Sequence, residues 1–320
     1  MLTLQDIEHA ASVVYRSFQA TPQYCWGLSS KRLGVDCWIK HENHTPVGAF
    51  KIRGGLTYFE ALRATCTLPT QVISARRGNH GQSMGWAARA QGVACTIVVP
   101  RGNSQEKNAA MRALGVTLVE HGDEFQDARE HAMALAAERG AHMVPSFHKD
   151  LVSGVATCWW EFFKAVPQMD VAYAPIGMGS GAAAAIQAKL ALGHRVKIVG
   201  VVSAHATSYA DSIAAGRVVA APVTTRLADG MACRMADPAA LSVLAPHLDR
   251  IVQVSDAEVA DAMRHLYADT HNVAEGAGAA SFAAAMQERA GLKGKTVGVT
   301  LCGGNVDAEV FARVLAGQWV

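Results

Sequence analysis

Short apolar segments alternate with longer amphipathic segments along most of the chain. The amphipathic segments begin at capping residues or end at glycines, which are typical helix boundaries. Predicted strands rich in Val and Ile cover residues 35–40, 71–74, 94–99, 116–120, 171–176, 197–202, 250–254 and 296–301, and predicted helices include 3–19, 80–91, 104–114, 124–139 and 255–270. Strands that alternate with helices of this length predict parallel sheets joined by right-handed crossovers. The fold class is therefore predicted to be α/β.

Composition and charge narrow the possible partners. The 320 residues are half apolar and 18% charged, and 29 basic against 27 acidic residues leave a net charge of +2. This balance argues against nucleic acid as a main partner, because such binding needs clustered basic residues. No segment reaches the roughly 18 uninterrupted apolar residues of a membrane span, and Asp6 and Glu8 lie where a signal peptide would be basic and then apolar. We expect no membrane association.

The cysteines and histidines do not indicate a disulfide framework or a zinc site. The seven cysteines are scattered and never spaced as C-x-x-C, which fits a reducing cytoplasm. His41 and His44 stand only three residues apart beside a predicted strand, whereas the helical zinc motif needs histidines four apart. We predict no bound metal.

A glycine-rich turn links the predicted strand 171–176 to the helix that follows it. Such a turn directs backbone N–H groups and the positive end of a helix dipole at an anion, for which phosphate is the natural candidate. The alternative is a plain turn that lets helix and strand pack closely. A dinucleotide is disfavoured, because the next strand ends at 201–203 (Val-Val-Ser) without an acid for the ribose. The turn is Gly177-Met178-Gly179-Ser180-Gly181.

Lys51 has an unusual setting for a lysine. Phe50 and Ile52 flank it, and Gly54 and Gly55 are expected to leave room for a bulky group. A desolvated lysine loses part of its proton affinity and can form a Schiff base with a carbonyl compound. Outside such a setting, a lone lysine is usually a surface charge.

Two more loops follow predicted strands. Residues 78–80 (Gly-Asn-His) open a helix after the strand 71–74, so their backbone amides could hold a carboxylate. Residues 302–305 (Cys-Gly-Gly-Asn) follow the strand 296–301. Because the carboxyl ends of parallel strands border one crevice, we predict that these loops, the glycine-rich turn and Lys51 share a cleft.

These segments, in this order, resemble the pyridoxal-phosphate enzymes of fold type II, the tryptophan synthase β fold, and in particular the serine/threonine dehydratases. The resemblance extends over most of the chain, and the ordered set is highly specific. Its segments are Thr21-Pro22, Lys40-x-Glu42-Asn43, the surroundings of Lys51, Gly78-Asn79-His80-Gly81-Gln82, Ala228-Asp229-Gly230 and Cys302-Gly303-Gly304-Asn305.

The resemblance implies roles for individual residues. Lys51 would carry the pyridoxal phosphate as a Schiff base and then remove the substrate α-proton. Asn79 would bond the phenolic oxygen of the cofactor. Cys302 would face the pyridine nitrogen, where a neutral thiol makes the ring a weaker electron sink than an aspartate would. The phosphate would be held by Gly177, Met178, Gly179, Ser180 and Gly181.

One position departs from related dehydratases, which have Ser or Thr two residues before the Gly of Gly-Asn-His, where it binds the substrate carboxylate. Here that residue is Arg76, and Arg77 follows it. Either the arginines point to solvent while the amides of Gly78, Asn79 and His80 bind the carboxylate, or one arginine pairs with an anionic group of the substrate. The second option favours 3-hydroxyaspartate over threonine. Arg77 also replaces a serine that serves racemases as an acid/base, so racemisation is less expected.

The implied reaction is loss of water from a β-hydroxy-α-amino acid such as threonine or serine, giving a 2-oxo acid and ammonia. Substrates of the 3-hydroxyaspartate, phenylserine or hydroxyectoine type stay open. A β-replacement synthase of the cysteine synthase kind is a further alternative, although the segments around Asp229 and Cys302 favour a dehydratase. A cofactor carrier without catalysis is disfavoured by Lys51. Some related enzymes bind a cation through acids after the strand 197–202, but residues 202–208 contain none.

The resemblance also implies how the chain is divided. A small domain, residues 40–145, is expected to be inserted into a larger cofactor-binding domain built from 1–39 and 146–320. The cofactor would lie between the two. A homodimer is expected, and no C-terminal regulatory domain is expected after the core.

Overall fold

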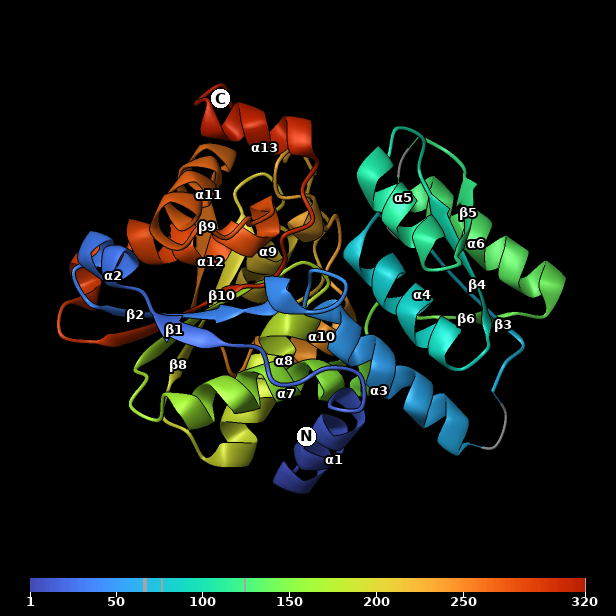
Figure 1. Ribbon diagram of the computed structural model, residues 1–320, viewed down its shortest axis with the longest axis horizontal. Helices are drawn as coiled ribbons and strands as arrows, with labels where there is room; N and C mark the ends of the chain where they lie inside the picture. The colour runs from blue at the N-terminus through green and yellow to red at the C-terminus, as the bar shows by residue number, and fades with distance from the viewer. Residues whose placement is uncertain (66–67, 76, 124, 320) are drawn as a thin grey trace.

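The computed structural model describes residues 1–65, 68–75, 77–123 and 125–319, and these residues form two β-sheets (Figure 1). The larger sheet has the strand order β1-β2-β10-β7-β8-β9, and the smaller one has the order β5-β4-β3-β6. Neighbouring strands pair in parallel, except that β1 is antiparallel to β2 at one edge of the larger sheet. The predicted α/β class is confirmed.

The eight predicted strands are present, each within one residue of its predicted bounds. Two short edge strands, β1 and β6, were not predicted, because three and two residues are too few to show a hydrophobic pattern. The strands are β1 (Gln23–Cys25), β2 (Asp36–His41), β3 (Gln71–Ala75), β4 (Ala94–Val99), β5 (Thr117–Glu120), β6 (His142–Met143), β7 (Val171–Pro175), β8 (Lys197–Ser203), β9 (Arg250–Val254) and β10 (Thr296–Leu301).

The predicted helices are present as α1, α4, α5, α6 and α11, and α1 and α11 begin with capping boxes at Thr3 and Ser255. Helix α1 ends at Val14 rather than Gln19, and residues 15–17 form a turn. The helices are α1 (Leu4–Val14), α2 (Gly27–Leu33), α3 (Lys51–Ala64), α4 (Asn79–Ala90), α5 (Gln105–Ala113), α6 (Phe125–Arg139), α7 (Lys149–Ala165), α8 (Ser180–Leu192), α9 (Ser208–Ala215), α10 (Pro238–Leu244), α11 (Asp256–Thr270), α12 (Gly276–Gln287) and α13 (Ala308–Leu315), with 3₁₀ turns η1 (Glu42–His44), η2 (Asp229–Met231) and η3 (Arg289–Leu292).

Both sheets are covered by helices on their two faces. In β7, Val171 and Tyr173 pack with α11 and α12, whereas Ala172 and Ala174 pack with α7 and α8. In the smaller sheet, β3 and β4 lie between α3 and α4 on one face and α6 on the other. Strands buried on both faces have few polar residues, which is why the apolar runs predicted them so closely.

Helix α3 lies between the two sheets and packs against α4 from one side and α7 from the other. A Cβ on Gly54 would come within 2.6 Å of the backbone oxygen of Leu151 in α7, and a Cβ on Gly55 would overlap Ser83 in α4. The expectation that these glycines leave room for a bulky group fails at Gly55, which lines neither cavity of the candidate site, whereas Gly54 lines one of them. The two glycines make room for the neighbouring helices.

The histidines 41 and 44 belong to an aromatic cluster. Their rings stack with centroids 5.1 Å apart, and Trp26 donates to His41 Nε2 at 2.9 Å. The described residues contain no group of three or more His, Cys, Asp or Glu side chains arranged to hold a metal ion. Within the same residues, none of the helices has the length and apolar character that a bilayer crossing requires.

A cluster of buried charges surrounds Arg53, which follows Lys51 by two residues in α3. Arg53 contacts Glu42 at 2.7 Å and Glu161 at 2.6 Å, and Lys40 contacts the second oxygen of Glu161 at 2.6 Å. The side chains of Arg53, Lys40 and Glu42 are fully shielded from solvent. Burial alone would raise the pKa of Glu42, but the charge and hydrogen bonds of Arg53 outweigh it, and the pKa is lowered. Two cations and two carboxylates thus balance one another.

We expect Arg53→Met to destabilise the protein by about 3–5 kcal/mol, because it leaves the buried Glu42 without its ion-pair partner and Glu161 with Lys40 alone among the described residues. Urea unfolding of wild type and variant measures the change in free energy. Arg63→Met is the matched control on the same helix, since Arg63 pairs with Glu60 at an exposed site. Equal stability of the two variants would contradict the structural role of the cluster.

Candidate active site

Two adjoining cavities open where the carboxyl ends of β7 and β10 meet α3 and α4. The inner cavity is lined by Phe50, Lys51 and Cys302, among others, and by the whole turn 177–181. The outer cavity is lined by Arg77, Gly78, Asn79, His80, Lys107 and Asp229, among others. Both cavities share Lys51, Asn79 and Gly177. The structure therefore brings the sequence-predicted site residues that it describes into one region, whereas Arg76 lies outside the described residues.

The glycine-rich turn carries the chain from β7 into α8. Gly179 has a φ of +91°, a left-handed conformation that favours glycine. A Cβ on Gly177 would overlap the backbone oxygen of Gly230. Among the described side chains none caps the N-terminus of α8, so the first N–H groups of this helix are available to an anion in the inner cavity.

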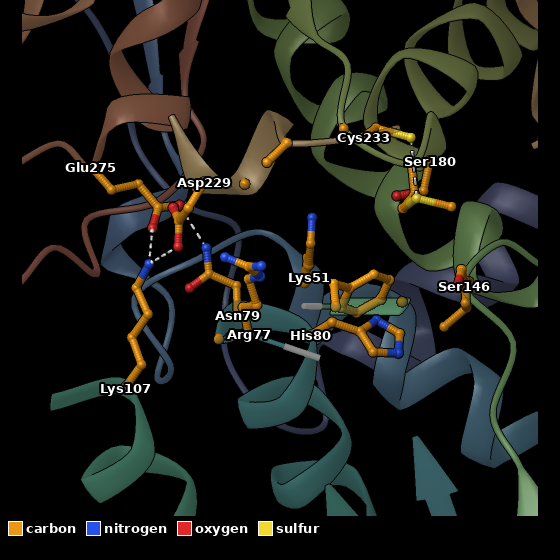
Figure 2. A pocket seen from close by; sticks show the side chains of 18 of the residues that line it. Lys51, Arg77, Asn79, His80, Lys107, Ser146, Ser180, Asp229, Cys233 and Glu275 are labelled. Carbon is orange, nitrogen blue, oxygen red and sulfur yellow. Dashed lines mark hydrogen bonds and ion pairs between the residues drawn. The ribbon is translucent and has the colours of Figure 1, made fainter. Parts of the chain in front are cut away.

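Lys51 is the first residue of α3, and its side chain extends into the cavity (Figure 2). Its Nζ lies 4.3 Å from the centre of the Phe50 ring. The backbone oxygen of Lys51 accepts a hydrogen bond from Ser83 at 2.6 Å. The N–H of Phe50 donates to the carbonyl of Cys302 at 3.0 Å, which ties the start of α3 to the end of β10.

The loop before α4 presents Arg77, Gly78, Asn79 and His80 to the outer cavity. Gly78 precedes the first turn of α4, and no described side chain caps that helix. Its N-terminal amides can therefore bind a carboxylate. Arg77 is exposed, and Figure 2 shows its guanidinium beside Asn79.

Cys302 lies at the end of β10, and its thiol is buried. The Sγ donates a hydrogen bond to the carbonyl oxygen of Ala277 at 3.4 Å. Burial raises the pKa of Cys302 to about 12. The thiol is therefore neutral at physiological pH and carries no charge into the cavity.

Three charged residues of the cavity wall were not among the predicted site residues. Lys107 Nζ lies 2.5 Å from Asp229 Oδ2 and 3.9 Å from Glu275 Oε2. Burial raises the pKa of Glu275 to about 7, although the charge of Lys107 opposes the rise. Asp229 stood in a recognised segment of the sequence. Lys107 and Glu275 gave no signal, because a single charged residue near a helix start is usually a solvated one.

A family model described as pyridoxal-phosphate-dependent enzyme matches residues 18–303. The chain belongs to this family. Pyridoxal phosphate is its cofactor, and the cavity residues of this family member fit it. The inner cavity offers an amine at Lys51 and an uncapped helix start behind a turn in which a side chain at position 177 would not fit.

Known members of the family resemble this chain over nearly its whole length. L-threonine ammonia-lyase of Thermotoga maritima is 30% identical over 319 residues, which cover 98% of this chain and 78% of the relative. L-threo-3-hydroxyaspartate ammonia-lyase of Saccharomyces cerevisiae is 29% identical, with 99% and 97% covered. The processed form of threonine deaminase isoform 2 from Solanum lycopersicum superposes with a TM-score of 0.88 at 27% identity, with 99% of this chain and 95% of that chain covered.

We expect Gly177→Ala to weaken pyridoxal phosphate binding roughly ten- to a hundredfold, because the added methyl group collides with backbone at Gly230. Titration of the apoenzyme with the cofactor, followed by absorbance, measures the dissociation constant. Gly181→Ala is the matched control, since its Cβ would lie at an ordinary contact distance of 3.6 Å from Phe50. The same loss in both variants would show that the fit of the turn at Gly177 is not the cause.

Proposed function

We propose that the protein is a pyridoxal-phosphate-dependent ammonia-lyase that dehydrates a β-hydroxy-α-amino acid such as threonine or serine to a 2-oxo acid and ammonia. The observation that carries this proposal is the position of Lys51. Its side chain lines both the inner cavity, with the turn 177–181, and the outer cavity, with the loop 78–80. One amine can therefore serve a phosphate-anchored cofactor and a carboxylate-anchored substrate. The relatives named threonine ammonia-lyase and threonine deaminase support the reaction.

Each part of the site has a task in this reaction. Bound pyridoxal phosphate supplies an electron sink that weakens the bond between the substrate α-carbon and its hydrogen. Lys51 would hold the cofactor, and its Nζ, when free, would accept the α-proton. The amides of residues 177–181 would hold the phosphate, and the amides of 78–80 would hold the substrate carboxylate. The substrate loses one water, and a second water releases ammonia.

Cys302 favours elimination among the reactions open to this site. Its neutral thiol donates to the Ala277 carbonyl, so it does not place a negative charge beside the ring. Without that charge, bound pyridoxal phosphate would be a weaker electron sink, which favours rapid loss of a β-substituent over slower proton exchange. Arg77 stands at the position where a racemase would need a second acid/base, which further supports elimination.

A panel of β-hydroxy amino acids tests the proposed function. We expect the holoenzyme to release equal amounts of ammonia and 2-oxo acid from threonine or serine with no added nucleophile, which a β-replacement synthase would require. Lys51→Ala should lower the rate at least about 100-fold and abolish the absorbance band of the lysine-bound cofactor. Absence of 2-oxo acid from every panel member, in a protein that retains this band, would contradict the proposal.

A second candidate substrate carries a side-chain carboxylate, as 3-hydroxyaspartate does. Arg77 lines the outer cavity beside the predicted carboxylate site, and its guanidinium has no ion pair within the part of the chain that the structure describes. It is thus available to a second carboxylate, whether or not Arg76 assists. The yeast relative is named for this substrate.

Arg77→Met distinguishes the two substrates. If Arg77 binds a side-chain carboxylate, we expect kcat/KM for 3-hydroxyaspartate to fall about ten- to a hundredfold, the value of a charged hydrogen bond. Turnover of threonine should change by no more than about twofold. An equal loss on both substrates would exclude a role in side-chain selection.

We further propose the organisation that the family resemblance implies. The smaller sheet is built from residues between 71 and 143, and the larger sheet from strands before and after that segment. This supports a small domain of 40–145 inserted into a domain of 1–39 and 146–320. We also propose a cytoplasmic homodimer with a small-molecule substrate, without nucleic acid, membrane or metal partners.

A further inference from the structure

Lys107, Asp229, Glu275 and Asn79 form one connected group on the wall of the outer cavity (Figure 2). Lys107 Nζ lies 2.5 Å from Asp229 and 3.9 Å from Glu275. Glu275 in turn accepts a hydrogen bond on Oε1 from Asn79 Nδ2 at 2.5 Å. A charge on Lys107 can therefore act on Asn79 through a single intervening carboxylate.

The members of this group come from opposite sides of the cleft. Lys107 stands on α5, which packs with the smaller sheet, whereas Asp229 belongs to η2 and Glu275 precedes α12 beside the larger sheet. The lysine stem crosses the start of α4, where a Cβ on Gly78 would lie 2.7 Å from its Cδ. Only 8% of Lys107 is exposed. A lysine buried this far is held by its partners rather than by solvent.

The amide of Asn79 is fixed by two opposed hydrogen bonds. Its Oδ1 accepts from Asn305 at 2.8 Å, and its Nδ2 donates to Glu275. This pattern fixes the direction of the side chain and leaves one N–H of Nδ2 for another acceptor. That remaining N–H is the group which the family resemblance directs at the phenolic oxygen of the cofactor.

Glu275 is the member of the group whose protonation depends most on its neighbours. It is 2% exposed, and its Oε2 accepts no hydrogen bond within the described part of the chain. The charged or titratable groups that act on it are Lys107 from α5, Asp229 from η2, Lys51 from α3 and Cys302 at the end of β10. Burial and Asp229 raise the pKa of Glu275, whereas Lys107, Asn79 and Lys51 lower it, and the pKa is about 7.

We propose that Lys107 is a positioning residue, whose ammonium keeps Glu275 ionised and thereby holds Asn79 in the orientation that binds the cofactor ring. This inference rests on the cofactor position of the proposed function, but not on which amino acid is the substrate. A protonated Glu275 would carry one O–H donor beside its remaining acceptor oxygen, so the hydrogen bond from Asn79 would lose its charge assistance and orient the amide less firmly.

The test is a pH titration of the visible absorbance of the holoenzyme. Lys107→Met removes the cation, so the pKa of Glu275 should rise. The pH midpoint of the absorbance titration should then move up by about one pH unit or more. Asp229→Asn removes the neighbouring anion, so the midpoint should move down. Lys107→Arg keeps the charge and should stay near wild type. Arg101→Met removes an exposed cation before α5 and is the control.

The same substitutions made in the Glu275→Gln variant test whether Glu275 is the titrating group. In Glu275→Gln, adding Lys107→Met should no longer move the midpoint. The proposal is overturned if Lys107→Met shifts the midpoint equally with and without Glu275, if Lys107→Arg behaves like Lys107→Met, or if Lys107→Met and Asp229→Asn shift it in the same direction. The absorbance requires bound cofactor but no turnover, so this result stands apart from the substrate panel. If Lys107→Met does not fold, Asp229→Asn should still lower the midpoint and Lys107→Arg should leave it near wild type, and a higher midpoint in Asp229→Asn would overturn the proposal.

Discussion

The position of Lys51 depends on four ion-paired side chains that are shielded from water close to the start of α3. Arg53 follows Lys51 by two residues, so the two side chains leave the first turn of α3 on different sides. Arg53 and Lys40 are neutralised by Glu42 and Glu161, and the four residues come from β2, η1, α3 and α7. Moving any of these elements would expose an unpaired charge to an apolar interior, which is far costlier than losing an apolar contact. The cluster therefore fixes where α3 begins.

Most of the fold could be predicted from the sequence because its strands are buried on both faces. A strand such as β7 is an uninterrupted apolar run that ends at a glycine-rich turn, so both its existence and its end are visible. Helix α3 was not predicted, since Gly54 and Gly55 have low helix propensity and no side chain of the described residues caps its start. Its helical state is imposed by packing against α4 and α7, which sequence periodicity does not report.

The candidate site likewise contains residues that the sequence could predict and residues that it could not. Residues on loops at strand ends, such as 78–80 and 177–181, could be found because loop chemistry is local in sequence. The pairing of Lys107 with Asp229 joins residues 122 positions apart. Asp229 stands in a recognised segment, but nothing local distinguishes Lys107 or indicates that the two residues meet. Glu275 acquires its raised pKa only from tertiary structure, through its burial and the nearby charge of Asp229, while the charge of Lys107 acts in the opposite direction. Groups whose properties are created by tertiary contact are thus invisible in a single sequence, even where the backbone that carries them is predictable.

The close packing of α3 limits how the two sheets can move relative to each other. On one side the backbone at Gly54 touches the backbone at Leu151, a contact with no flexible side chain to yield. On the other side a Cβ on Gly55 would overlap the hydroxyl of Ser83 and lie 2.9 Å from its backbone oxygen. Backbone therefore closes both boundaries of α3. A hinge motion that admits substrate would have to bend the chain beyond the ends of α3, rather than slide either sheet along this helix.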